Sequence, residues 1–122
     1  MMLEHERTSY LIRGCVFEVY KQLGCGYLEK VYERALLREL FLHGLHAKTQ
    51  VSFEVHYKGV VVGEYFADMV VERSVILELK AQQQLPRESE SQLLNYLKAS
   101  GLRLGFLINF AFPRARIKRV IL

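Results

Sequence analysis

The chain has 122 residues, of which 51% are hydrophobic and 25% charged, with a formal net charge of +4. This balance is typical of a soluble globular protein, and the length suits one domain (residues 1–122) and excludes two ordinary ones. No segment approaches the roughly 20 apolar residues of a membrane span, and no apolar segment follows the charged start Met1–Arg7. We therefore expect no membrane helix, no signal peptide and a cytoplasmic location.

Apolar residues recur at helical spacing in the first third of the chain. They do so from about Thr8 to Leu23 and again from about Tyr27 to Leu42. Residues 24–26 break the pattern, and His43-Gly44 ends it. Two helices are predicted, and the apolar stripe of the second contains Leu28, Val31, Ala35, Leu36 and Leu40.

From Lys48 onward the apolar period changes to two, which is typical of strands. Residues 51–57 alternate in polarity, and residues 60–66 return as their partner after the turn Lys58-Gly59. Residues 67–71 and 75–80 are two further apolar stretches.

The last third of the chain predicts one helix and two strands. The helix is expected from Arg87 to Ser100, a buried strand from Leu104 to Phe110, and a final strand from Arg116 to Leu122. The predicted fold class is α/β (α+β), with element order ααββββαββ and helices packed on a sheet.

Basic residues are concentrated near the end of the sequence. No Asp or Glu follows Glu90, whereas six basic residues do: Lys98, Arg103, Arg114, Arg116, Lys118 and Arg119. Such a region can bind phosphates. The alternative is that the basic residues protect a terminal edge strand against aggregation.

Two charged residues interrupt the apolar stretch 75–80. Residues two apart on a strand share a face, so Ile76, Glu78 and Lys80 point the same way. Charges on the face of a central strand destabilise it unless they are paired or bind something. The simplest pairing is a salt bridge from Lys80 to Glu78 or Asp68 at the end of an exposed strand.

Strand register predicts a second carboxylate beside Glu78. If residues 72–74 are a hairpin loop, Val71 pairs with Val75 and Asp68 lies opposite Glu78. Cβ atoms of opposed residues are about 4.5–5.5 Å apart, so one carboxyl protonates unless a cation lies between them. Oxygen ligands without nearby His or Cys favour Mg²⁺ or Mn²⁺ over zinc. The carbonyl oxygen of Leu79 could complete the metal shell.

Three helical residues extend this candidate site. Gln92 and Tyr96 are four apart and share one helix face, although this pair alone is also typical of an ordinary helix surface. Glu29 lies in the first turn of the second helix. It either complements the helix dipole or binds metal directly or through water.

These residues together resemble the PD-(D/E)xK nuclease superfamily. Residues 26–32, Gly-Tyr-Leu-Glu-Lys-Val-Tyr, are similar to the signature of the small GxxExxY proteins. The pair Gln92 and Tyr96 is similar to the QxxxY element of RecB-like exonucleases. The resemblance runs from about Tyr10 to Val120, and the order and spacing of its fragments carry it. The other fragments are residues 57–59, 63–65, 93–97 and 104–110.

The resemblance implies a restriction-endonuclease-like core, a mixed sheet flanked by helices. It implies Asp68 and Glu78 as metal ligands, Lys80 beside the nucleophilic water, and Glu29 as an additional acidic residue. Gln92 and Tyr96 are expected to line the site and contact nucleic acid.

The expected activity is Mg²⁺-dependent hydrolysis of phosphodiester bonds, with Mn²⁺ possible and DNA favoured over RNA as substrate. A homodimer or a partner protein is expected to supply specificity. One alternative is a junction-resolving endonuclease, and another is a nucleic-acid- or protein-binding module with weak or no catalysis.

The sequence departs from related ones at two positions. Tyr20 stands where they usually have His, and Cys25 stands where they usually have Pro. If that histidine helps to hold metal, Tyr20 implies a weaker or differently organised site. The Cys25 change is expected to affect only the turn.

Overall fold

The computed structural model describes residues 5–122, so residues 1–4 of the charged start lie outside the described residues. The elements are α1 (Glu6–Leu23), α2 (Glu29–Leu42), β1 (Ala47–Tyr57), β2 (Val60–Val71), β3 (Val75–Lys80), α3 (Glu88–Ser100), β4 (Leu104–Phe110) and β5 (Ala115–Ile121). The predicted fold class is confirmed. The order differs in one respect, because no turn separates residues 60–66 from 67–71 and both belong to β2.

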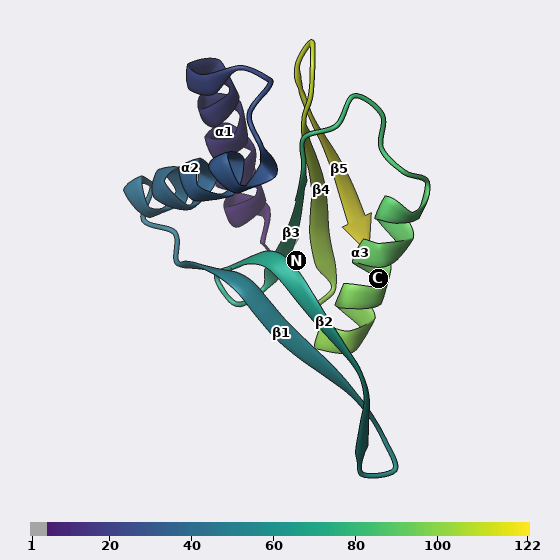
Figure 1. The fold of residues 1–122 in the computed structure, drawn as a ribbon. Helices are drawn as coiled ribbons and strands as arrows, with labels where there is room; N and C mark the ends of the chain where they lie inside the picture. Colours follow the sequence, from purple (N-terminus) through teal and green to yellow (C-terminus); the bar gives the residue numbers. More distant parts are fainter. Residues whose placement is uncertain (1–4) are drawn as a thin grey trace.

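The strands form one mixed sheet in the order β1-β2-β3-β4-β5. Strands β3 and β4 are parallel, and the other neighbours are antiparallel. Because parallel neighbours need a crossover, α3 connects β3 to β4. Helices α1 and α2 lie on one face of the sheet and α3 on the other (Figure 1). None of the helices formed by residues 5–122 is long and apolar enough to cross a membrane.

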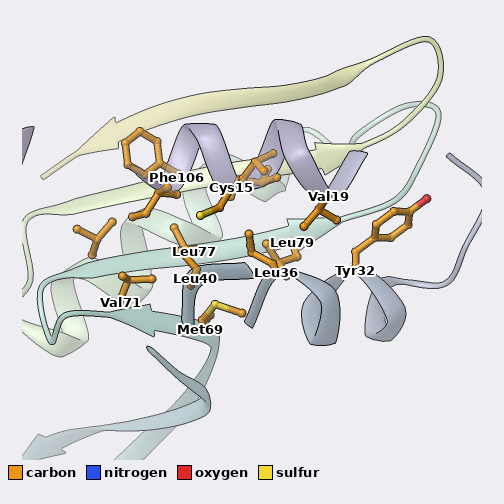
Figure 2. Packing of buried hydrophobic residues seen from close by; sticks show 14 of the residues in the cluster. Cys15, Val19, Tyr32, Leu36, Leu40, Met69, Val71, Leu77, Leu79 and Phe106 are labelled. Atoms are coloured by element: carbon orange, nitrogen blue, oxygen red, sulfur yellow. The ribbon is translucent and has the colours of Figure 1, made fainter. Parts of the chain in front are cut away.

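The larger hydrophobic core lies between the sheet and helices α1 and α2. Figure 2 shows Cys15 and Val19 of α1 and Leu36 of α2 facing Leu77 and Leu79 of β3. This confirms the predicted strand parity, because Ile76 packs in the separate core under α3.

The apolar stripe of α2 differs from the predicted one. Leu28 and Val31 are 80% and 38% exposed, so their expected burial is wrong. Tyr32 is buried instead: its ring stacks on Phe110 with 4.4 Å between centroids, and its hydroxyl donates a 2.6 Å hydrogen bond to the carbonyl oxygen of Gly24. An aromatic ring with a satisfied hydroxyl buries more apolar surface than either aliphatic side chain.

The β2–β3 hairpin has the predicted register. Val71 pairs with Val75, and the ladder continues through Val70–Ile76 to Met69–Leu77. The next position along both strands is that of Asp68 and Glu78.

Candidate active site

Asp68 and Glu78 meet where the backbone ladder between β2 and β3 ends. The N–H of Asp68 donates to Oε1 of Glu78 at 2.9 Å, and the N–H of Leu79 donates to Oδ2 of Asp68 at 2.8 Å. Each carboxylate therefore binds the backbone of the opposite strand in place of a ladder bond. The structure brings these two predicted site residues together.

Each carboxylate also has a second oxygen available to a ligand. Among residues 5–122, no group hydrogen-bonds to Oδ1 of Asp68 or Oε2 of Glu78. Every fully buried side-chain oxygen among the described residues has a hydrogen-bond partner. Because these two oxygens have none, both are at least partly exposed to solvent. Both oxygens can therefore accept a further bond.

The donor set fits a hard divalent cation. Within residues 5–122 no group of three His, Cys, Asp or Glu side chains is arranged to hold a metal. Two carboxylates nevertheless suffice for Mg²⁺, which usually keeps several waters and binds through one or two carboxylates. Leu79, whose carbonyl oxygen was expected to join the shell, directly follows Glu78 on β3.

Burial makes both carboxyls costly to ionise. Glu78 is 6% exposed, and burial is the main cause that raises its pKa to about 8, followed by the charge of Asp68. Burial also raises the pKa of Asp68, although the N–H of Leu79 opposes this shift. Each group is therefore stabilised by binding either a proton or a cation.

Lys80 lies at the end of β3 and is partly buried. It forms no ion pair or hydrogen bond with any residue from 5 to 122, so the simple salt bridge to Asp68 or Glu78 is absent from this part of the chain. Its charge still lowers the pKa of both carboxyls. The ammonium group is thus close to the acidic pair and available to a ligand.

Helix α2 brings two acidic residues toward Asp68, of which only Glu29 was predicted. Glu29 begins α2 and is exposed. Glu33, one turn later, is 7% exposed. The charges of both glutamates raise the pKa of Asp68, and the contribution of Glu33 is the larger. Lys30 pairs with Glu33 at 3.3 Å. The i,i+4 spacing of the two glutamates was the available signal in the sequence.

Gln50 links this helix to the sheet. Its Nε2 donates to Oε1 of Glu33 at 3.2 Å. In β1 it lies between Thr49 and Val51, which pair with Met69 and Ala67 on either side of Asp68. The left-handed φ of 53° at Gln50 marks a local irregularity there, and such irregularities in strands are common beside active sites. Sequence reasoning missed this residue.

Helix α3 contributes Tyr96 to the neighbourhood of the acidic pair. Burial raises the pKa of the Tyr96 phenol, and the charges of Glu78 and Asp68 add to the shift. Its ring packs against Tyr65 of β2, with 5.3 Å between centroids. Gln92 is exposed one turn earlier on the helix and has no hydrogen bond to residues 5–122.

Asn109 holds the loop that follows Lys80. It is 5% exposed, its Oδ1 accepts a 3.0 Å hydrogen bond from the N–H of Gln82, and its Nδ2 donates to the Gln82 carbonyl oxygen at 2.8 Å. It also pairs with Lys80 in the β3–β4 ladder. Asn109 thus fixes the end of β3.

Tyr20 has a structural contact. Its hydroxyl donates a 2.7 Å hydrogen bond to the carbonyl oxygen of Ala111, which ties α1 to the end of β4. Cys25 is an exposed free thiol in the turn between α1 and α2.

Comparison with known proteins gives both a family and a fold. The model of the PD-(D/E)XK nuclease superfamily matches residues 6–120. A crystal structure of SSO0001 is similar with a TM-score of 0.60 and 16% identity, over 99% of this chain and 78% of that one. An alkaline exonuclease, LHK-Exo from Laribacter hongkongensis, is similar with a TM-score of 0.55 and 10% identity, over 99% and 72%. No curated protein matches the chain.

Proposed function

The chain belongs to the PD-(D/E)XK nuclease superfamily, and we propose that it is a Mg²⁺-dependent nuclease that hydrolyses phosphodiester bonds, of DNA in preference to RNA. Nucleases of this superfamily act on nucleic acid and generally use divalent metal ions. We also propose that its nearer relatives are the GxxExxY proteins.

In this proposal Asp68 and Glu78 hold the ion through their unpaired oxygens. The carbonyl oxygen of Leu79 and the carboxylate of Glu29, directly or through water, complete its surroundings. A bound Mg²⁺ or Mn²⁺ supplies a water of lowered pKa and stabilises negative charge on the phosphate.

Lys80 orients or deprotonates the attacking water. Its charge also stabilises the pentavalent phosphate that forms in the transition state. Gln92 and Tyr96 contact the nucleic acid from α3. A second copy of the chain or a partner protein supplies specificity, because one domain of this size has little surface for sequence recognition.

The single observation that carries this proposal is the arrangement of Asp68 and Glu78. Each carboxylate accepts a hydrogen bond from a backbone N–H of the opposite strand, Glu78 from Asp68 and Asp68 from Leu79, and keeps one oxygen for a ligand. A purely structural pair would be expected to use Lys80 as its counter-ion, and within residues 5–122 it does not.

The test is cleavage of single-stranded DNA, duplex DNA and RNA by the purified protein with Mg²⁺ and with EDTA. Asp68→Asn and Lys80→Ala should each reduce Mg²⁺-dependent cleavage by roughly 10²–10⁴-fold. The matched exposed variants Glu54→Gln and Lys48→Ala should cleave like the wild type.

Cleavage that persists unchanged in both site variants would contradict the proposal. Binding of nucleic acid without any metal-dependent cleavage would favour the alternative of a binding module. Preferential cleavage of branched over linear DNA would identify a junction-resolving endonuclease.

A further inference from the structure

A cavity of about 450 Å³ on the α3 side of the sheet is lined by Leu107 and Asn109, the β4 residues that pair with Glu78 and Lys80. Besides β4, three segments line it: the loop after β3, the β4–β5 turn, and β5. From these come Gln83 and Leu85, Phe112 and Pro113, and Arg116 and Lys118.

Strand register connects this cavity to the candidate active site. Lys80 pairs with Asn109, and Asn109 pairs with Arg116. These three residues therefore form one row across β3, β4 and β5. Two strand spacings amount to roughly 10 Å, which is the length of about three stacked nucleotides of one strand. One ligand chain can therefore reach both Lys80 and Arg116.

The cavity is basic, and one of its cations is unpaired. Arg116 has no ion pair or hydrogen bond with residues 5–122. Lys118 pairs with Glu90 at 2.9 Å, but both side chains are about half exposed, and exposed pairs of this kind contribute little free energy. A phosphate can therefore bind Arg116 and displace Glu90 from Lys118 at small cost.

An exposed aromatic ring lies next to these cations. Phe112 is 64% exposed, although an aromatic ring normally gains from burial. The Gln83 side chain donates a 3.2 Å hydrogen bond to the Phe112 carbonyl oxygen. Asn109 forms two hydrogen bonds with the backbone of Gln82, the residue before Gln83. The walls are thus held in place before any ligand binds.

We propose that this cavity binds one nucleotide of a single-stranded nucleic acid, close to the bond that is cleaved. Arg116 and Lys118 bind its phosphate, and Phe112 stacks on its base. An unpaired base is needed because a duplex keeps both faces of its bases stacked, whereas aromatic residues in single-strand binding proteins stack on bases directly. This inference rests on the proposed nuclease function.

The test is fluorescence anisotropy in EDTA, so that no cleavage occurs, with fluorescein-labelled oligo(dT) and oligo(U) of roughly 16 nucleotides, the upper end of typical site sizes. A labelled DNA duplex serves as a third probe. The variants are Arg116→Gln, Phe112→Ala and Phe112→Tyr. Arg119→Gln is the matched control, because Arg119 is exposed on the opposite face of β5 and its loss changes the net charge equally.

Arg116→Gln should weaken binding of oligo(dT), oligo(U) or both several-fold, and should reduce the salt slope by about 0.7, the value for one single-strand phosphate contact. Phe112→Ala should weaken single-strand binding by about fivefold or more without changing duplex binding, and Phe112→Tyr should restore it. Arg119→Gln should weaken oligonucleotide binding less than Arg116→Gln does.

The inference is overturned if Arg116→Gln binds like Arg119→Gln, if Phe112→Ala affects duplex and single strands equally, or if the wild type binds neither oligonucleotide. The two proposals can fail separately. A wild type that binds in the expected way but cleaves nothing refutes the nuclease and keeps the subsite. If the wild type cleaves nucleic acid but the Arg116 and Phe112 variants bind it normally, the subsite is refuted and the nuclease function is kept.

Discussion

Glu78 is a carboxylic acid that the fold surrounds with apolar residues and a second carboxylate. Its side chain is nearly inaccessible, and its pKa of about 8 contrasts with the ordinary value of 4.5. Between these two pH values the folded protein keeps a proton that the unfolded chain has lost. Stability contributed by this group is therefore fully present below about pH 4.5 and is lost as pH rises through about 8.

Replacing Glu78 with Gln should remove this dependence. Without divalent metal, the variant should be more stable than the wild type at about pH 9, by an amount on the order of a few kcal/mol, and the difference should shrink toward about pH 5. Urea denaturation at both pH values measures it. Glu64→Gln, at an exposed position of β2 where the carboxylate accepts a hydrogen bond from the Ser52 hydroxyl, should show no such pH-dependent difference. An equal effect of Glu78→Gln at both pH values would contradict the account.

The sequence predicted the acidic pair because it depends on local geometry alone. Strand parity and a three-residue hairpin loop are enough to place Asp68 next to Glu78. Glu33 could not be predicted in the same way, because it approaches Asp68 through the packing of α2 on the sheet. Gln50 lies opposite Asp68 because the β1–β2 register shifts between Val55 and His56, an irregularity that the alternation of polarity does not reveal. Register within one hairpin is a short-range property, whereas the position of a helix over a sheet depends on the whole core.

Helix α3 packs tightly on the sheet at Gly105 of β4. A Cβ there would lie 2.9 Å from Cδ1 of Leu93 and 3.2 Å from the carbonyl oxygen of Ile76. Gly105→Ala should therefore lower the free energy of unfolding by about 1–3 kcal/mol through overpacking.

Gly14→Ala is the matched control for this change. Gly14 lies in the middle of α1, is exposed, and an added Cβ meets nothing within 4 Å. Alanine is the better helix former, so this variant should gain about 0.5–1 kcal/mol. Urea denaturation of both variants gives the comparison, and a loss of stability in Gly14→Ala or none in Gly105→Ala would be inconsistent with the packing described.

Asn109 connects β4 to the loop after β3, and its removal should loosen the end of the strand that carries Lys80. Asn109→Ala leaves the N–H and carbonyl oxygen of Gln82 without partners, which should cost about 1–3 kcal/mol. Hydrogen exchange of the Gln82 amide should become faster. Asn95→Ala, at an exposed position of α3, is the control and should change neither quantity. Unchanged exchange at Gln82 in Asn109→Ala would refute this role.

The types and order of the elements followed from apolar periodicity, with two exceptions. Residues 60–71 form one strand because nothing in that stretch favours a turn, although two separate apolar stretches were predicted there. The buried stripe of α2 begins at Tyr32, because the ring stacks on Phe110 of β4. That partner lies far away in the sequence, so periodicity within the helix could not identify it.

At the scale of the whole molecule, opposite charges lie on either side of β3. In the sheet, Asp68 of β2 lies on one side of β3 and the basic residues of β5 lie on the other, with Glu78 and Lys80 on β3 itself. This polarity suits a ligand that carries both phosphates and a bound cation. Phosphates can bind the basic side, and the cation can bind Asp68 and Glu78.

Calorimetric titration of the protein with Mg²⁺ at about pH 7 measures whether Asp68 and Glu78 form a divalent-cation site. At this pH the carboxyl of Glu78, with a pKa of about 8, holds a proton that the cation must displace. The heat of Mg²⁺ binding should therefore differ between two buffers of different ionisation enthalpy, and Glu78→Gln and Asp68→Asn should bind Mg²⁺ much more weakly than the wild type. Identical heats in both buffers, or Mg²⁺ binding that is equally tight in the two variants, would contradict such a site.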